Sequence, residues 1–239
     1  MGFLATPLGY ILKGLYDLVG NYGITLILLT IAVKLLLYPL YAKQIKSTAK
    51  MGTLQPKLQE IQQKYAKDKQ LMNEKVAELY KEEGVSMTGG CLPMIVQMII
   101  IMGLFALLRT PMLYLGNDEQ MLFAIHEQFL WIQDLAQPDK WILPIAAGVA
   151  TFISFTMSQK NNMVSTPNQQ QMKMMNVFMK YLFPVMILLM ARSYPAGLAI
   201  YWFFSQVIQI FYNIRFNKLR KELRGEKTPK GKKKIKAKA

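Results

Sequence analysis

Four long stretches that are apolar and nearly free of charge constrain this chain more than any other feature. Residues 84–108, 141–159 and 193–214 contain no charged residue, and residues 18–42 contain only Lys34. A helix that crosses a lipid bilayer needs about 20 mostly apolar residues. Each stretch is long enough for one such helix, so the pattern predicts a protein that spans a membrane several times.

A fifth stretch, 177–191, is interrupted only by Lys180, which could extend its ammonium group to the membrane interface. A turn-forming sequence follows at 192–197, which makes 177–214 a predicted membrane hairpin. The sequence therefore predicts an all-α membrane protein with five transmembrane helices. Their expected ranges are 22–42, 91–108, 141–158, 177–192 and 197–214.

Composition excludes several classes of protein. The chain has 52% apolar residues, 18% charged residues and a net charge of +15, which argues against disorder and against an ordinary soluble enzyme. With one Cys and one His it builds no internal disulfide and no metal site from those residues. The uncharged stretches exclude a soluble nucleic-acid-binding bundle. We expect a protein that is not an enzyme and needs no cofactor or metal.

Basic residues alternate between the predicted connections and so indicate the orientation in the membrane. Residues 43–90 hold nine Lys and Arg, residues 109–140 hold two beside five acids, residues 159–180 hold three, the 192–197 turn holds one, and residues 215–239 hold twelve. Cytoplasmic connections carry the excess of basic residues. The counts predict that the first and third connections and the C-terminus are cytoplasmic and that the N-terminus is outside.

Residues 1–20 precede the first predicted span, and no convincing signal-peptide cleavage pattern follows them. Their apolar residues recur at helical spacing, which favours an amphipathic helix on the outer interface over a simple lead-in to the span. These residues are Phe3, Leu4, Leu8, Ile11, Leu12, Leu15 and Leu18.

The connection 43–90 carries two apolar stripes at helical spacing, separated by a polar break at 67–69, and is predicted as a helical hairpin with Pro56 near a helix start or kink. It is long for a simple connector, so we favour a role in receiving a client over a solvated spacer. The candidate contact residues are Leu54, Pro56, Leu58, Ile61, Tyr65, Leu71 and Met72.

The segment 217–239 is strongly basic and is predicted to be a disordered cytoplasmic tail, with seven Lys and no acid after residue 226. Such a run binds polyanions such as ribosomal RNA, or anionic lipid. Charge alone does not separate these partners from a simple role in fixing topology. The methionines of 163–179 suit promiscuous apolar contact, although padding of the membrane boundary explains them equally well.

Lys34 is the most informative single residue. It lies nine residues before Lys43, about 13 Å along a helix, and no acid lies in any predicted span to pair with it. A charge at this depth costs on the order of 3 kcal/mol. Lys34 is therefore either neutral in hydrocarbon or charged in a water-filled cavity, and polar residues in other spans favour the cavity.

The residues expected to line this cavity are polar or aromatic residues of four predicted spans. Tyr201, Ser205 and Gln209 share one helix face. A role as glue between helices is the alternative for the Ser and Thr residues. A wet pocket with one positive charge suits an acidic peptide passing partly into the membrane. The predicted set is Thr30, Lys34, Gln97, Ser154, Tyr201, Ser205 and Gln209, with Thr151, Thr156 and Gln206 as further candidates.

Several short motifs, in this order, resemble the YidC membrane-protein insertase family. They are Val19-Gly20-Asn21-Tyr22-Gly23, Tyr38-Pro39-Leu40, Leu54-Gln55-Pro56-Lys57, Gly89-Gly90-Cys91-Leu92-Pro93 and Pro195-Ala196-Gly197-Leu198 before Tyr201-Trp202. The resemblance covers roughly residues 16–216. It implies a 21–216 core of five helices around a hydrophilic groove that opens to the cytoplasm and to lipid.

The resemblance also implies a function. A family member acts in the bacterial cell membrane as an insertase and chaperone for short or single-span proteins, alone or beside the Sec translocon, and we expect a monomer. Thr30, Tyr201 and Trp202 match groove positions, whereas Lys34 stands where the family usually has Arg. The large extracytoplasmic domain and the lipoprotein Cys of some members are absent. The alternative function is a small anion channel or carrier that uses Lys34.

Overall fold

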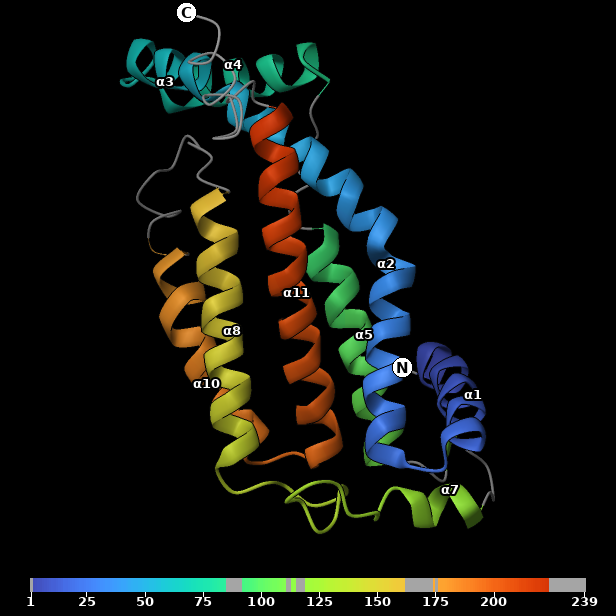
Figure 1. Ribbon diagram of the computed structural model, residues 1–239. Coiled ribbons are helices and arrows are strands. Elements are labelled where there is room, and N and C mark those ends of the chain that lie inside the picture. Colours follow the sequence, from blue (N-terminus) through green and yellow to red (C-terminus); the bar gives the residue numbers. More distant parts are fainter. Residues whose placement is uncertain are drawn as a thin grey trace, which may run out of the picture.

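The computed structural model describes residues 2–84, 92–110, 113–114, 119–161, 174 and 176–223, and it shows an elongated bundle of helices (Figure 1). Within these residues there is no strand, and an isolated bridge joins Phe129 to Ile132. The prediction of an all-α protein is confirmed for this part of the chain. Most of the tail 217–239 and of the methionine-rich connection lies outside the described residues.

The long helices coincide closely with the apolar stretches of the sequence. A π-helix, η1 (Phe178–Leu182), leads directly into α10, and Pro184 follows this junction, where the wider π turn accommodates a residue that has no N–H to donate. The helices of the bundle besides η1 are α1 (Gly2–Val19), α2 (Tyr22–Thr53), α5 (Leu92–Arg109), α8 (Ile142–Asn161), α10 (Phe183–Ala191) and α11 (Ala196–Leu223).

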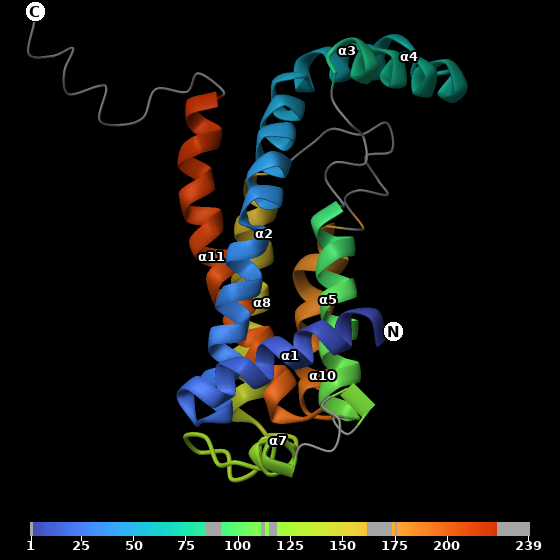
Figure 2. The same ribbon diagram turned by 90° about the vertical axis from the view of Figure 1, so that its right-hand side faces the viewer.

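Helix α11 lies between α2 and α8, and α8 packs in turn against α10. Helix α1 crosses the bundle at a steep angle and packs on α5 and α2, as Figure 2 shows. It ends at Gly20, whose φ of 66° is the left-handed conformation that glycine adopts readily at the end of a helix. The apolar core joins α1, α2, α5 and α11 through buried side chains that include Leu12, Leu26, Leu104 and Ile200.

Helix α2 extends eleven residues beyond the expected end of the first span. Residues 43–53 hold no proline, so nothing interrupts the helical hydrogen bonds where the sequence turns polar. The helix ends at Thr53, and α3 begins at Gln55 with Pro56 in its first turn, whereas Pro39 lies inside α2 without ending it. The cytoplasmic connection therefore starts as a continuation of α2, and only its later part forms the hairpin.

The hairpin consists of α3 (Gln55–Lys64) and α4 (Lys69–Glu82), and it lies at one end of the bundle (Figure 1). The Asp68 carboxylate caps α4 by accepting from the backbone N–H groups of Gln70 and Leu71, each at 3.0 Å. The two apolar stripes cover each other in a small separate core. That core consists of Leu54, Leu58, Val76, Leu79 and Tyr80.

The opposite end of the bundle is formed by the short helix α7 (Glu119–Ala124) and the loop 125–141. The carbonyls of Leu135 and Gln137 accept hydrogen bonds from the first backbone N–H groups of α11, those of Gly197 at 3.0 Å and Ala196 at 2.9 Å. Asp139 Oδ2 accepts from the backbone N–H of Leu143 at 2.6 Å. The loop thus caps both α11 and α8.

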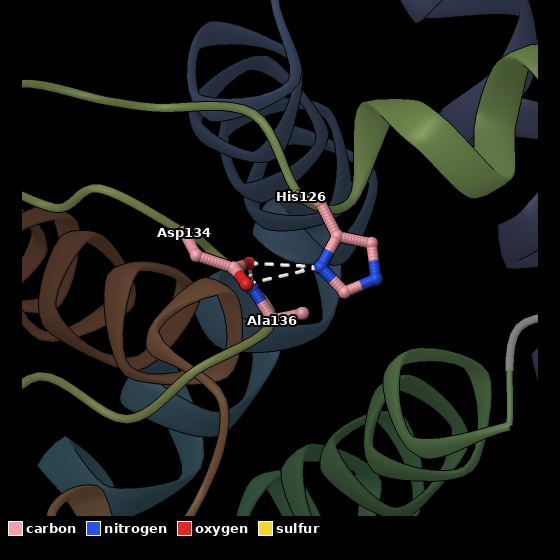
Figure 3. A network of polar contacts seen from close by, with 3 residues as sticks. All are labelled: His126, Asp134 and Ala136. Carbon is pink, nitrogen blue, oxygen red and sulfur yellow. Dashed lines mark hydrogen bonds and ion pairs between the residues drawn. The ribbon is translucent and has the colours of Figure 1, made fainter.

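The same loop is braced internally by an ion pair. Figure 3 shows His126 Nδ1 beside the Asp134 carboxylate, 3.0 Å from Oδ2, while Asp134 Oδ1 also accepts from the backbone N–H of Ala136 at 2.8 Å. The His126 side chain is exposed, and the Asp134 side chain is half-buried. The pair fixes the curve of the loop and leaves the backbone of 135–137 turned toward α11.

Glu127 fastens the loop to the start of the chain. Its Oε1 accepts from the Tyr16 hydroxyl of α1, and its Oε2 accepts from the backbone N–H of Tyr22 at the start of α2, at 2.8 Å. A carboxylate is favoured at a helix N-terminus, where backbone N–H groups lack partners. One acidic side chain therefore joins α1, α2 and the loop.

Two helical windows in the described residues are long and apolar enough to cross a bilayer by length and composition, Tyr22–Lys43 and Ile142–Gln159. Ile95–Arg109 and Phe178–Ala191 are apolar but shorter. The flanks of these helices expose large apolar side chains, which suits a lipid environment better than water. Examples of these exposed side chains are Leu36, Ile99, Val149, Leu189 and Phe211.

Candidate functional site

Lys34 lies deep in the bundle, on the face of α2 that meets α5 and α11. Its side chain is only 3% exposed. Its Nζ donates to Gln97 Oε1 of α5 at 3.1 Å and lies 3.5 Å from both Gln209 Oε1 of α11 and Tyr41 Oη of α2. Side chains from three helices thus converge on one ammonium group.

These hydrogen bonds continue beyond the lysine. Gln97 uses its Oε1 to accept from Lys34 and from the Tyr41 hydroxyl at 3.3 Å, and its Nε2 donates to Tyr201 Oη of α11 at 3.2 Å. We call Lys34, Tyr41, Gln97, Tyr201 and Gln209 the lysine cluster. Its members are buried or half-buried, and they join α2, α5 and α11 through polar contacts within an otherwise apolar bundle.

The lysine cluster contains no acidic group. Among the residues that the structure describes, no carboxylate lies within ion-pair distance of Lys34, and all its hydrogen-bond partners are neutral oxygens. A buried charge is costly unless it is paired, and dipoles compensate an ammonium group less completely than a carboxylate does. The cluster is therefore chemically suited to receive one negative charge from another molecule.

The predicted groove residues fall into two groups on different sides of α11. Tyr201 and Gln209 belong to the lysine cluster, whereas Trp202 Nε1 donates to Thr151 Oγ1 of α8 at 2.9 Å. Also toward α8, the Ser154 carbonyl accepts from Asn213 Nδ2 at 3.2 Å. The Thr151 contact fits the helix-gluing role that the sequence left open for Ser and Thr, whereas Ser154 contributes its backbone carbonyl and not its hydroxyl.

Two other predicted groove residues are buried without a bond to Lys34. Thr30 is fully buried, and its hydroxyl donates to the Leu26 carbonyl one turn earlier at 2.7 Å. Ser205 is 1% exposed on α11. Because Lys34 itself is 3% exposed, the described side chains close around its ammonium group, and an open hydrated groove stays a prediction.

Four aromatic rings cover the side of the lysine cluster toward the α3–α4 hairpin. Tyr38 stacks on Phe216 with ring centroids 5.7 Å apart, and Tyr212 lies 6.0 Å from Tyr41. We call Tyr38, Tyr41, Tyr212 and Phe216 the aromatic layer. The Tyr212 hydroxyl donates to the backbone carbonyl of Lys34 at 3.0 Å, so the layer is fastened to the same turn of α2 that carries the lysine.

The hairpin residues predicted to contact a client differ in accessibility. Leu54, Leu58 and Met72 are buried, so a folded hairpin does not present them to another molecule. The remaining members of the predicted set are exposed or half-buried and are therefore available for contact. They are Pro56, Ile61, Tyr65 and Leu71.

The site includes residues that sequence reasoning missed. Tyr41 lies seven residues after Lys34, two helical turns on the same face, so periodicity alone could have identified it. Tyr212 and Glu127 had no such signal, because their contacts with α2 join residues separated by 178 and 105 positions. Long-range packing of this kind is not visible in a single sequence.

Apolar helices with exposed apolar flanks, closed around one lysine, define a helical membrane protein with an internal polar site. The model of the 60Kd inner membrane protein family matches residues 14–223. The chain belongs to this family, that of the YidC membrane-protein insertases, and its membership confirms the resemblance inferred from the motifs.

Relatives named membrane protein insertase YidC agree with this assignment. The chain is 38% identical to that of Fusobacterium nucleatum over 204 residues, covering 85% of this chain and 89% of the relative. For Oceanobacillus iheyensis the identity is 41%, with 83% and 75% covered. For Caldanaerobacter subterraneus it is 35%, with 95% and 100% covered.

A solved structure gives the same result for the fold. The chain is similar to the active YidC insertase crystal structure with the first transmembrane domain resolved, with a TM-score of 0.59 and 28% identity. The similarity covers 87% of this chain and 45% of that one, so the chain spans about half the length of that protein.

Proposed function

We propose that this membrane-protein insertase of the YidC family uses Lys34 to hold the acidic, hydrated part of a client while the apolar part enters the bilayer. The observation that carries this step is a buried ammonium group whose described partners are all neutral. A client carboxylate would be its counter-charge, and their attraction is about 1 kcal/mol in water and several in a lower-dielectric interior. The family favours an insertase over the alternative of an anion channel.

The proposed membrane arrangement has five spanning helices, α2, α5, α8, η1–α10 and α11, with α1 on the outer interface. The hairpin and the end of α11 lie at the same end of the bundle, opposite α7 (Figure 1). These two segments are rich in basic residues, and basic segments favour the cytoplasm. The N-terminus is therefore outside and the C-terminus is cytoplasmic in a bacterial membrane.

Insertion proceeds in three steps in this proposal. The accessible face of the hairpin, including Pro56 and Leu71, contacts a short or single-span client at the cytoplasmic face. The lysine cluster then takes the acidic part of the client, and the apolar part moves along the helices into lipid. Burial of apolar surface drives the last step at about 25 cal/mol per Å². No covalent bond forms or breaks.

The partners follow from this arrangement. The clients are membrane proteins and the medium is the bilayer. We propose that the 21–216 core acts as a monomer, alone or beside the Sec translocon. The tail 217–239 holds the chain near ribosomes or anionic lipid through its lysines.

Reconstitution into vesicles tests the electrostatic step. Two single-span clients that differ only by Asp or Asn in the translocated tail are made by cell-free translation, and protease protection gives their initial insertion rates. Lys34→Ala should slow the Asp client about fivefold or more relative to the Asn client, while Lys34→Arg preserves the ratio because it keeps the charge.

Lys180→Ala is the matched control, because Lys180 is also a lysine of a predicted span but lies over the Tyr181 ring outside the lysine cluster. It should leave the ratio of the two clients unchanged. Equal ratios in the wild type, Lys34→Ala and Lys34→Arg would remove Lys34 from the mechanism.

A further inference from the structure

The hydrogen bonds around Lys34 limit how its ammonium group becomes available to a client. An ammonium group has three N–H donors. The acceptors within 3.5 Å of Nζ are Gln97 Oε1, Gln209 Oε1 and Tyr41 Oη, one from each of three helices. Lys34 must therefore release at least one neutral oxygen before it meets a carboxylate. Lysine lacks the forked, five-donor geometry of arginine, so it has no spare donor to share.

Release of the ammonium group affects Gln97 most. Its Oε1 accepts the shortest of the three bonds, at 3.1 Å, and its Nε2 is already engaged with Tyr201 at 3.2 Å. A buried oxygen left without a donor costs about 1–3 kcal/mol, more than a hydrogen bond contributes when both partners stay satisfied. Withdrawal of Lys34 would carry this cost unless a second donor stood beside the same oxygen.

Tyr41 is such a donor. Its hydroxyl lies 3.3 Å from Gln97 Oε1, and its ring face lies 5.3 Å from Lys34 Nζ, within the range of a cation–π contact. The ring is 6% exposed and packs against Tyr212, so the hydroxyl keeps its position when the flexible lysine moves.

We propose that Tyr41 is a positioning residue for the insertion step: its hydroxyl stays hydrogen-bonded to Gln97 Oε1 as the remaining donor when the ammonium group of Lys34 turns to an acidic client. Without a client, the tyrosine ring and hydroxyl hold the ammonium group in the lysine cluster. Tyr41 thereby favours clients with acidic tails, because only they withdraw Lys34. The inference rests on the proposed function, since it requires that Lys34 meets client carboxylates.

Tyr41→Phe tests the hydroxyl and keeps the ring. It removes a weak 3.5 Å contact to Lys34 but also the second donor to Gln97 Oε1 among the described residues, and the second loss is larger. In the vesicle assay with the Asp and Asn clients, we expect the Asp client to slow by about tenfold while the Asn client is unchanged. The Asn client shows that the variant is folded and inserted.

Tyr181→Phe is the matched control, because Tyr181 is a tyrosine of another predicted span that is 53% exposed and belongs to neither the lysine cluster nor the aromatic layer. It should leave both clients unchanged. The same pair of clients is then measured with Tyr41→Phe in the Lys34→Ala background, where the hydroxyl should have no further effect on their ratio.

The outcomes separate this inference from the proposed function. If Lys34→Ala lowers the Asp/Asn ratio but Tyr41→Phe leaves it unchanged, raises it, or slows both clients equally, the role of Tyr41 is overturned alone. A loss of ratio by Tyr41→Phe that persists in Lys34→Ala overturns it as well, because the hydroxyl would then act without the lysine. If Lys34→Ala has no effect, the electrostatic step fails and the inference fails with it.

Discussion

At the scale of single residues, individual side-chain contacts fasten α2 to its neighbours at two places, around Lys34 and Tyr41 and around Gly23. Lys34 and Tyr41 lie two helical turns apart on one face of α2, and this seven-residue spacing is visible in the sequence. Gly23 illustrates the opposite case. It lies at the start of α2, and a Cβ at this position would overlap the ring of Phe129 in the outer loop. The sequence gives no reason for this glycine, because Phe129 lies more than a hundred residues away.

Gly23→Ala should therefore destabilise the protein. Overpacking of a closed contact costs about 1–3 kcal/mol, which should appear as a lower midpoint of thermal unfolding in detergent. Gly14→Ala is the matched control, because nothing lies within 4 Å of a Cβ at that exposed helical position, and alanine favours the helix. In a Phe129→Ala background Gly23→Ala should cost little, and an equal cost in both backgrounds would contradict the contact.

At the scale of elements, the sequence predicted helices well and their contacts poorly. Apolar periodicity identified α3 and α4, and charge-free stretches identified the long helices, because local composition determines both. The apolar stretch predicted the extent of the first span, which the window Tyr22–Lys43 matches, but it did not show that the helix itself continues past the membrane boundary to Thr53. The division of the predicted groove residues between α5 and α8 was also invisible, because it depends on the rotation of α11 in the bundle.

The contact between α1 and the outer loop predicts a pH dependence. The hydrogen bond to Glu127, with burial and the charge of that carboxylate, raises the pKa of Tyr16 from 10.0 to about 12. The folded state therefore binds the tyrosine proton more tightly than the unfolded state. The stabilisation is fully present below pH 10 and is lost as the pH rises from 10 to about 12.

Thermal unfolding of the wild type and Tyr16→Phe across this range measures the effect. Tyr16→Phe should be less stable at pH 8, where the wild type keeps its hydrogen bond, and the difference should shrink between pH 10 and 12. Tyr10→Phe serves as the control, because Tyr10 is 72% exposed on the same helix. A difference that stays constant up to pH 12 would contradict the role of the Tyr16–Glu127 bond.

At the scale of the whole molecule, the basic hairpin and the acidic outer loop lie at opposite ends of one bundle (Figures 1 and 2). The alternating charge counts predicted this separation from sequence, because the positive-inside rule reads the connections one at a time. The helices were predictable as well, because the apolar stretches, like the charge counts, are local features of the sequence. The polar contacts that join the helices, namely the lysine cluster and the hydrogen bonds of Glu127 to Tyr16 and Tyr22, involve residues that are distant in the sequence.

Single cysteines introduced on a Cys91→Ser background test the orientation. Gln133→Cys in the outer loop and Glu60→Cys in the hairpin are both at exposed positions. In intact cells, a maleimide that does not cross membranes should label position 133, and should label position 60 only after permeabilisation. The reverse pattern would invert the proposed topology, and the Cys91→Ser parent without an added cysteine gives the background.

The backbone hydrogen bonds from the loop 135–137 to the first residues of α11 have a mechanical consequence. Together with the Glu127 and Asp139 contacts they tie α1, α2, α8 and α11 to one another at this end of the bundle, whereas the aromatic layer near the other end joins only α2 and α11, by ring packing and the Tyr212 hydrogen bond. We expect the helices to spread by pivoting about the outer end. Such a motion opens the bundle to a polypeptide from one end only. Because the other end stays closed, no continuous path for ions forms across the membrane during insertion.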